Sequence, residues 1–169
     1  MKIVLLGYMA SGKSAVGRKL AEKLDLQFVD LDDFIEENEE MSISDMFSKK
    51  GEIYFRKKES EYLEILLNNK KNLLISSGGG TPCYGNNLNS IKEKSISIYL
   101  DASIQTIFDR LKNETSQRPL VATIGIDSLK EYIAKHLFER RNFYEKATHK
   151  ISVNNKSIAE ISTEVLELF

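Results

Sequence analysis

The chain has 169 residues, a length that suits one compact domain with a single core, so we expect one domain over residues 1–169. Its 24 Lys and Arg nearly balance its 25 Asp and Glu, which disfavours a broad surface for nucleic acid or for an anionic membrane. The apolar start is too short for a signal peptide, and no apolar run is long enough to span a membrane. The lone cysteine, Cys83, has no disulfide partner and no assigned role. A cytoplasmic protein is therefore expected.

Short apolar segments alternate with helical patterns along the chain. Segments rich in β-branched and apolar residues predict strands at 2–6, 27–30, 72–76, 96–100 and 150–153. The first helical pattern repeats apolar residues at a spacing of four through Val16, Leu20 and Leu24, and the last begins at a capping box of Ser157 and Glu160. We predict an α/β domain of three layers, α/β/α, with a central five-stranded parallel sheet whose ligands gather at the carboxyl ends of the strands.

A glycine-rich segment, GYMASGKS, directly follows the first predicted strand. It matches G-x-x-x-x-G-K-[ST] through Gly7, Gly12, Lys13 and Ser14. In such a loop the backbone N–H groups and the helix N-terminus form a nest for anions, Lys13 would reach the terminal phosphates and the Ser14 hydroxyl would ligate Mg²⁺. A plain strand-to-helix turn explains the glycines but not the Lys and Ser that follow them. The segment predicts a nucleotide site.

Acidic residues follow the second predicted strand in the segment FVDLDDFIEE. Asp30 and Asp32 emerge where the sheet meets its ligands, where a carboxylate can hold Mg²⁺ through water or accept a proton from an attacking hydroxyl. We favour function for these two residues. Asp33, Glu36 and Glu37 are better explained as acids that favour a helix N-terminus.

Three glycines at 78–80 end the third predicted strand, where they permit close approach of the backbone to a ligand. Arginines at four positions could surround the same site: Arg56, Arg118 and the pair Arg140 and Arg141. Because arginine holds carboxylate and phosphate through two parallel hydrogen bonds, such a group suits an anionic acceptor and a migrating phosphoryl group.

Two further patterns favour structural roles. The Lys- and Glu-rich runs at 36–40 and 57–61 are expected to be solvated helix faces. Aromatic residues near the segment HLFERRNFYEKA are expected to pack in the core or between helices: Tyr132, Phe138, Phe143 and Tyr144.

Six motifs together resemble those of the shikimate kinase family, in the family's order and approximate spacing. They are GYMASGKS, FVDLDDFIE, FR within GEIYFRKKE, the GGG after a strand, RPL and RRNFY. The resemblance covers essentially the whole chain and implies a P-loop fold similar to nucleoside-monophosphate kinases. It further implies a substrate-binding segment at about 31–61 and a lid at about 112–124. The implied reaction moves the γ-phosphate of ATP to the 3-hydroxyl of shikimate, within chorismate and aromatic amino-acid biosynthesis.

On the nucleotide side, the resemblance implies that residues of the glycine-rich loop surround the ATP phosphates: Ala10, Ser11, Gly12, Lys13, Ser14 and Ala15. Ser14 would bind Mg²⁺ directly and Asp30 would serve its outer shell. Arg118, on the lid, would close over ATP and join Lys13 in neutralising the transferring phosphate.

On the acceptor side, the resemblance implies that Asp32 binds the shikimate hydroxyls and takes the proton from the one that attacks. Arg56 and Arg140 would grip the shikimate carboxylate, and the backbone at Gly79 would approach the ring hydroxyls. Arg141 would be a surface neighbour of Arg140.

The chain also departs from the family pattern. Ala10 and Ala15 stand where many members have glycine and threonine, and both are small enough to keep the shape of the loop. The segment SVNNKSIAE lacks the arginine that members often place against adenine. Arg110 is a candidate to stack on adenine instead, with an exposed helix terminus as the other interpretation.

Two other functions remain open at this point. A kinase of another small hydroxy acid such as gluconate could share the loop and the lid, although Asp32, Arg56, Gly79 and Arg140 match a carboxylate opposite hydroxyls. A nucleotide-binding module without turnover is the other alternative. We expect ATP and Mg²⁺ as ligands, shikimate as the small-molecule partner, no nucleic acid or membrane, and a monomer.

Overall fold

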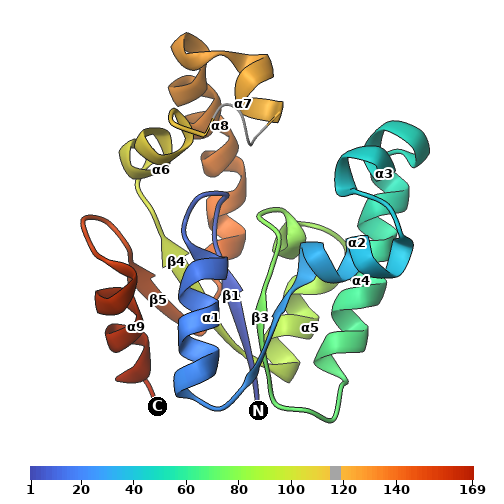
Figure 1. The fold of residues 1–169 in the computed structure, drawn as a ribbon, viewed down its shortest axis with the longest axis vertical. Coiled ribbons are helices and arrows are strands. Elements are labelled where there is room, and N and C mark those ends of the chain that lie inside the picture. The colour runs from blue at the N-terminus through green and yellow to red at the C-terminus, as the bar shows by residue number, and fades with distance from the viewer. Residues whose placement is uncertain (115–118) are drawn as a thin grey trace.

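The computed structural model describes residues 1–114 and 119–169. It confirms the predicted parallel sheet, which has five strands in the order β2-β3-β1-β4-β5 (Figure 1). The strands are β1 (Lys2–Leu6), β2 (Gln27–Asp30), β3 (Leu73–Ser76), β4 (Ile96–Asp101) and β5 (His149–Ser152). Each lies within one residue of its predicted bounds because the apolar runs are short and clearly delimited.

Helices connect and flank the strands. Their bounds are α1 (Lys13–Lys23), α2 (Leu31–Glu39), α3 (Ile43–Lys50), α4 (Glu52–Leu67), α5 (Asn87–Lys94), α6 (Ile104–Leu111), α7 (Pro119–Ile124), α8 (Ile126–Tyr144) and α9 (Ile158–Leu166), with a short 3₁₀ helix η1 (Thr81–Cys83). The predicted capping box forms, because the Ser157 hydroxyl accepts from the N–H of Glu160 while the Glu160 carboxylate accepts from the N–H of Ser157.

The order of the strands places the helices in two layers. From β1 the chain runs toward one edge of the sheet to form β2. From β3 to β4 and from β4 to β5 it runs toward the opposite edge. Because parallel crossovers are right-handed, α1 lies on one face and α5 and α8 lie on the opposite face. The direction in which strands are added reverses beside β1. The loops after β1, β2 and β3 therefore lie together at the carboxyl ends of the strands.

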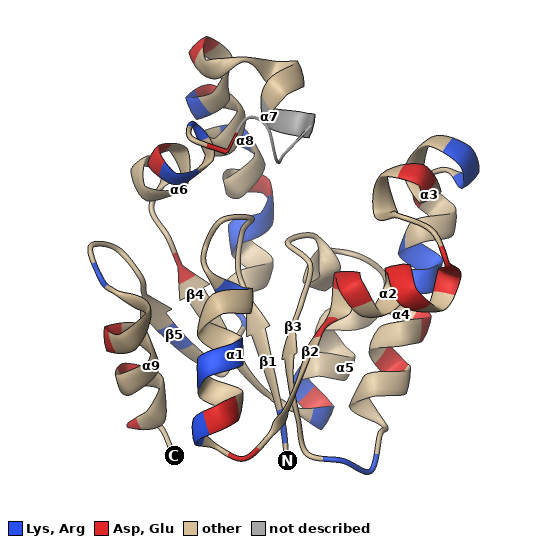
Figure 2. Cartoon of the chain, viewed as in Figure 1, with Lys and Arg blue, Asp and Glu red and all other residues tan. Residues whose placement is uncertain are grey.

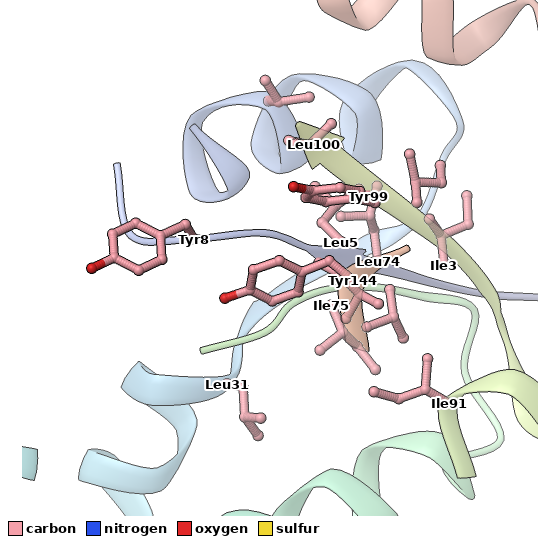
Figure 3. Close-up of a cluster of buried hydrophobic side chains, with 14 of the residues drawn as sticks. Ile3, Leu5, Tyr8, Leu31, Leu74, Ile75, Ile91, Tyr99, Leu100 and Tyr144 are labelled. Atoms are coloured by element: carbon pink, nitrogen blue, oxygen red, sulfur yellow. The ribbon is translucent and has the colours of Figure 1, made fainter. Parts of the chain in front are cut away.

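The core fills both sides of the sheet. All of Ile3 to Leu6 in β1 are fully buried, as a central parallel strand requires. Tyr99 and Tyr144 are also buried and their ring centroids lie 5.2 Å apart among aliphatic side chains (Figure 3). The packing role expected of Tyr144 is thus confirmed, whereas the one expected of Phe138 is wrong: 84% of that side chain is exposed, because its position on α8 faces away from the sheet.

Charges of both signs occur on most helices. Figure 2 shows Lys and Arg as well as Asp and Glu over most of the helices, while α2 carries acidic residues alone and the strands carry few charges. Within residues 1–114 and 119–169, no helix combines the length and apolar character needed to cross a bilayer. Recognition of a charged ligand therefore depends on local side chains.

Candidate active site

The glycine-rich loop turns from β1 into α1 with an unusual backbone. Ala10 has a φ of 60° and Gly12, the residue before α1, has a φ of 96°. A positive φ strains an L-residue by about 1 kcal/mol, so the loop carries this cost at Ala10 and avoids it at Gly12. The Lys13 ammonium donates to the carbonyls of Gly7 and Tyr8 at 2.8 and 3.0 Å, so its cation lies within the loop.

Ser14 and Asp30 lie side by side at the start of α1 and the end of β2. The Ser14 hydroxyl donates to Asp30 Oδ2 at 2.6 Å, and Asp30 Oδ1 accepts from the N–H groups of Asp32 and Asp33 at 3.0 and 3.3 Å. Asp30 thus caps α2, while Asp33 stands in its first turn as expected of a helix N-terminal acid. The cap leaves a fixed carboxylate and hydroxyl facing the glycine-rich loop.

Asp32 is the most perturbed carboxyl group at this edge of the sheet. Burial, with the like charges of Asp30 and Glu59 adding to it and Lys13 opposing it, raises the pKa of Asp32 from its ordinary value of 3.8 to about 6. A carboxylate with a pKa near 6 is mostly ionised at neutral pH and is a better proton acceptor than an exposed one. Its position and its pKa fit a base that acts on a hydroxyl.

These groups line one cleft of about 350 Å³. Its walls come from the loops after β1, β2 and β3 and from α6: Met9, Ala10, Gly12, Lys13, Ser14, Ala15, Asp30, Asp32, Ser76, Ser77, Gly78, Gly79, Arg110 and Glu114. Most of the lining is polar or backbone, which suits a charged ligand rather than an apolar one.

The glycine run after β3 brings two arginines to the same loop. A Cβ at Gly79 would stand 3.1 Å from Arg140 Nη1, and a Cβ at Gly80 would stand 2.8 Å from both terminal nitrogens of Arg56. A side chain at either position would force a guanidinium to shift, so the glycines permit the close approach seen here. Arg140 is half-buried, whereas Arg141 is exposed, as expected of its surface neighbour.

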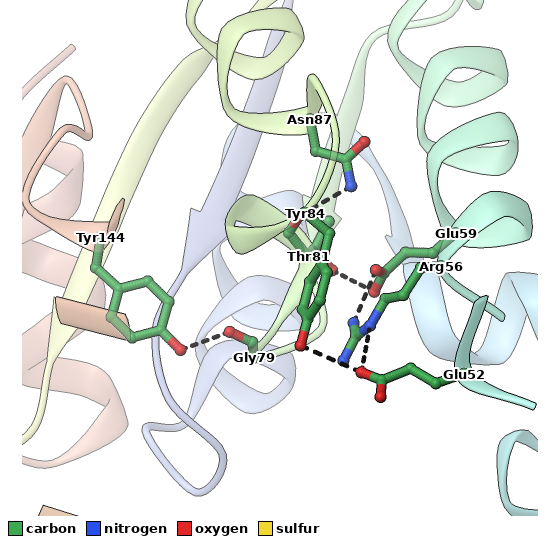
Figure 4. A network of polar contacts seen from close by, with 8 residues as sticks. All are labelled: Glu52, Arg56, Glu59, Gly79, Thr81, Tyr84, Asn87 and Tyr144. Carbon is green, nitrogen blue, oxygen red and sulfur yellow. Dashed lines mark hydrogen bonds and ion pairs between the residues drawn. The ribbon is translucent and has the colours of Figure 1, made fainter. Parts of the chain in front are cut away.

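Arg56 belongs to a buried polar network (Figure 4). Its Nη1 donates to Glu59 Oε1 at 2.9 Å, and the Thr81 hydroxyl donates to the other carboxylate oxygen of Glu59 at 2.9 Å. Glu59 is 1% exposed, so the expectation that the 57–61 run is a solvated face is wrong at this residue. The reason is tertiary, because α4 turns Glu59 toward the glycine run, where Thr81 and Arg56 satisfy its charge.

Arg110 lies closer to the loop than an exposed helix terminus would. It is half-buried in the last turn of α6, and its Nη1 donates to the carbonyl of Ala10 at 2.8 Å. The geometry therefore favours a residue at the nucleotide side of the cleft, and its contact with adenine stays a prediction. Arg118, predicted on the lid, lies outside the described residues.

Besides the lining residues Met9, Ser76, Ser77 and Glu114, sequence reasoning missed three residues that hold the glycine run and its arginines: Glu59, Tyr84 and Tyr144. The Tyr144 hydroxyl donates to the carbonyl of Gly79 at 2.5 Å and so anchors the glycine run to α8. Glu59 follows Arg56 by three residues and Tyr144 follows Arg140 by four, spacings that place each pair on one helix face and that could have revealed both. Tyr84 carries no such signal.

The fold and the site together define a P-loop kinase of a small anionic molecule, with a phosphate-binding loop facing a carboxylate and two arginines across one edge of a parallel sheet. A family model described as Shikimate kinase matches residues 9–169. The chain belongs to the shikimate kinase family, whose members are ATP-dependent phosphotransferases.

Curated relatives match over nearly the full length. The chain is 45% identical over 168 residues to the shikimate kinase of Flavobacterium johnsoniae, covering 99% of this chain and 98% of the relative. It is 42% identical over 164 residues to that of Sulfurihydrogenibium sp., covering 97% and 95%.

Solved structures agree with these relatives. The shikimate kinase of Bacteroides thetaiotaomicron superposes with a TM-score of 0.93 at 30% identity, over 99% of this chain and 97% of that one. A shikimate kinase from Acinetobacter baumannii, solved in complex with shikimate, gives 0.88 at 28% identity, over 99% and 91%. A gluconokinase from Sinorhizobium meliloti gives 0.60 at 16% identity, over 98% and 89%, a likeness that shows the shared fold alone.

Proposed function

We propose that this chain transfers the γ-phosphate of ATP to the 3-hydroxyl of shikimate, giving shikimate 3-phosphate and ADP, within chorismate and aromatic amino-acid biosynthesis. The observation that carries the proposal is that phosphate-binding residues and a candidate base line the same cleft at one edge of the sheet. Lys13 and Ser14 stand on the phosphate side, and Asp32 stands on the acceptor side of the same cleft. Phosphoryl transfer needs in-line positioning and charge stabilisation more than covalent help, and these residues supply both.

The acceptor half of the proposal assigns each polar group of shikimate a partner. Arg56 and Arg140 bind the carboxylate, with the backbone at Gly79 close to the ring hydroxyls. Asp32 binds the 3-hydroxyl and accepts its proton as the oxygen attacks the γ-phosphorus. The bond from that phosphorus to the bridging oxygen breaks, and ADP leaves. Support comes from the approach of both guanidinium groups to the glycine run and from the pKa of Asp32 near 6.

The nucleotide half rests on the glycine-rich loop. Backbone N–H groups of residues 10–15 bind the phosphates, Lys13 reaches the transferring group, and Arg110 contributes from the side of the nucleotide base. Arg118 completes the lid at about 112–124 and neutralises charge during transfer, a role supported by the family resemblance of its RPL motif. The segment at about 31–61 carries the acceptor contacts of Asp32 and Arg56, within one domain.

Mg²⁺ fits the oxygen ligands of Ser14 and Asp30. The Ser14 hydroxyl donates its proton to Asp30 and so keeps lone pairs for a cation, and Asp30 offers its carboxylate to the outer shell. In the part of the chain that the structure describes, no group of three acidic, histidine or cysteine side chains could hold a metal. A hydroxyl and one carboxylate suffice because Mg²⁺ keeps several waters and binds nucleotide phosphates, whose charge it neutralises.

One domain carries the glycine-rich loop, Asp32 and both arginines of the proposed acceptor site. We therefore propose a monomer. The gluconate alternative loses support because the gluconokinase likeness shows the fold alone. A module without turnover would need neither the perturbed carboxyl group of Asp32 nor the arginines opposite it.

The proposal is tested by following ADP release from Mg·ATP with shikimate, with gluconate or without an acceptor. Lys13→Ala is the inactive variant, and Lys23→Ala removes an exposed cation from the same helix as the matched control. We expect release that requires shikimate, persists in Lys23→Ala and disappears in Lys13→Ala, with shikimate 3-phosphate identified by ³¹P NMR. ATP binding without release for any acceptor would establish the binding module instead.

A further inference from the structure

The Arg56 guanidinium is covered on one face by an aromatic ring that no motif of the sequence predicts. Its Cζ lies 3.9 Å from the ring centroid of Tyr84, closer than its distances of 5.1 and 6.0 Å to the rings of Phe55 and Phe47 (Figure 4). A distance of 3.9 Å is direct contact between a planar cation and a π face. Tyr84 comes directly after η1, so it reaches Arg56 from the loop that follows the glycine run.

Tyr84 is itself held in place. Its hydroxyl donates to Glu52 Oε1 at 3.2 Å, and the same oxygen lies 3.6 Å from Arg56 Nε, at ion-pair distance. Ring, carboxylate and guanidinium thus form a closed triangle. On another side, Gly80 approaches so closely that even a Cβ would stand 2.8 Å from the terminal nitrogens of Arg56. One short loop therefore clamps Arg56 with both a backbone and a ring.

The clamp leaves hydrogen-bonding capacity on Arg56. Nη1 is bonded to Glu59, while the buried Nε makes no hydrogen bond within the described residues. A ring in contact with the guanidinium carbon limits how that group can turn, so its five N–H bonds keep a fixed direction toward a ligand. Fixing that plane in advance lowers the entropy that a long side chain loses when it binds a carboxylate.

We propose that Tyr84 is a positioning residue for the acceptor, because its ring sets the plane in which Arg56 meets the acceptor carboxylate. The inference rests on the proposed function and assigns to that site a residue outside its motifs. It differs from a purely structural role for Tyr84, which would lower stability and affect both substrates alike. A positioning role affects the acceptor and spares ATP.

The test compares steady-state kinetics of Tyr84→Leu, Tyr84→Met and Tyr84→Phe with the unaltered chain. Loss of the ring in the leucine and methionine variants should raise KM for shikimate roughly five- to tenfold, while KM for ATP and kcat stay within about twofold. Tyr84→Phe keeps the ring and should restore KM to within about threefold. The matched controls are Tyr62→Leu and Tyr62→Phe, since Tyr62 is an aromatic residue whose hydroxyl donates to Glu39 at 3.1 Å, away from Arg56.

A double-mutant cycle makes the test specific for Arg56. Lysine has no planar fork, so in an Arg56→Lys background Tyr84→Leu should change KM for shikimate less than about twofold further. Equal effects in both backgrounds, or an unchanged KM in Tyr84→Leu, would overturn the inference. If Tyr84→Leu unfolds, Tyr84→Met and Tyr84→Phe decide between the two roles. An unaltered chain without shikimate-dependent turnover would instead refute the proposed function.

Discussion

Replacing Asp32 by asparagine should make the ligand-free protein more stable while it abolishes transfer. The pKa of Asp32 lies about two units above its ordinary value, mainly because burial disfavours the charged form. Each unit is worth about 1.4 kcal/mol, so the ionised group destabilises the folded state by about 3 kcal/mol at neutral pH. The amide of the Asp32→Asn variant carries no such charge, so we expect the substitution to raise the free energy of unfolding by about 2–3 kcal/mol at pH 8, or Tm by roughly 5–10 °C.

The dependence on pH follows from the sign of the shift. Well below pH 3.8 Asp32 is protonated in both the folded and the unfolded chain, so the free energies of unfolding of the two proteins should differ little. Between pH 4 and pH 6 Asp32 is ionised in the unfolded chain but still largely protonated in the folded one, so the unaltered protein loses stability as pH rises. The difference in free energy of unfolding between the two proteins, the stability gap, therefore grows and becomes constant above about pH 6. Urea unfolding followed by circular dichroism from pH 4 to pH 8 measures this gap.

Asp25→Asn provides the control for that measurement. Asp25 is an exposed carboxylate with a φ of 53°, a conformation that asparagine adopts readily, so its removal should give no comparable gap. A difference between Asp32→Asn and the unaltered protein that is independent of pH, or a loss of stability at pH 8, would refute the assignment of a destabilising, partly buried charge to Asp32. Stability gained with activity lost is the usual signature of such a site.

Three other outcomes follow from the same geometry. If Asp32 takes the proton, kcat/KM for shikimate should fall about tenfold per pH unit below about pH 6, and a profile flat down to pH 4.5 would contradict that role. Arg140→Ala should weaken acceptor binding by about 2–5 kcal/mol, seen as a raised KM for shikimate, while Arg141→Ala on the exposed neighbour serves as the control and should change it little. Ser14→Ala should raise the Mg²⁺ concentration needed for half-maximal activity by about tenfold or more, and an unchanged requirement would remove Ser14 from the metal site.

Much of the fold was accessible from the sequence because it depends on local patterns. The five strands read as short apolar runs, and the glycine-rich loop combines its phosphate-binding chemistry in the eight residues 7–14. The capping box of Ser157 and Glu160 is likewise a contact between residues three apart. Resemblance to a family extended this to the reaction, and the family match over residues 9–169 confirmed the family.

What the sequence determined by itself, then, was the type of fold and the phosphate loop, because these depend on neighbours along the chain, while the class of reaction came from the resemblance to a family. Only the tertiary structure decided that Glu59 is buried against Arg56, that Phe138 faces solvent and that Tyr84 covers a guanidinium from another loop. Such contacts join residues that are separate in the sequence or choose one face of a helix over another. They are set by how the helices pack on the sheet: the three-residue spacing puts Glu59 on the helix face of Arg56, but only the packing buries that face.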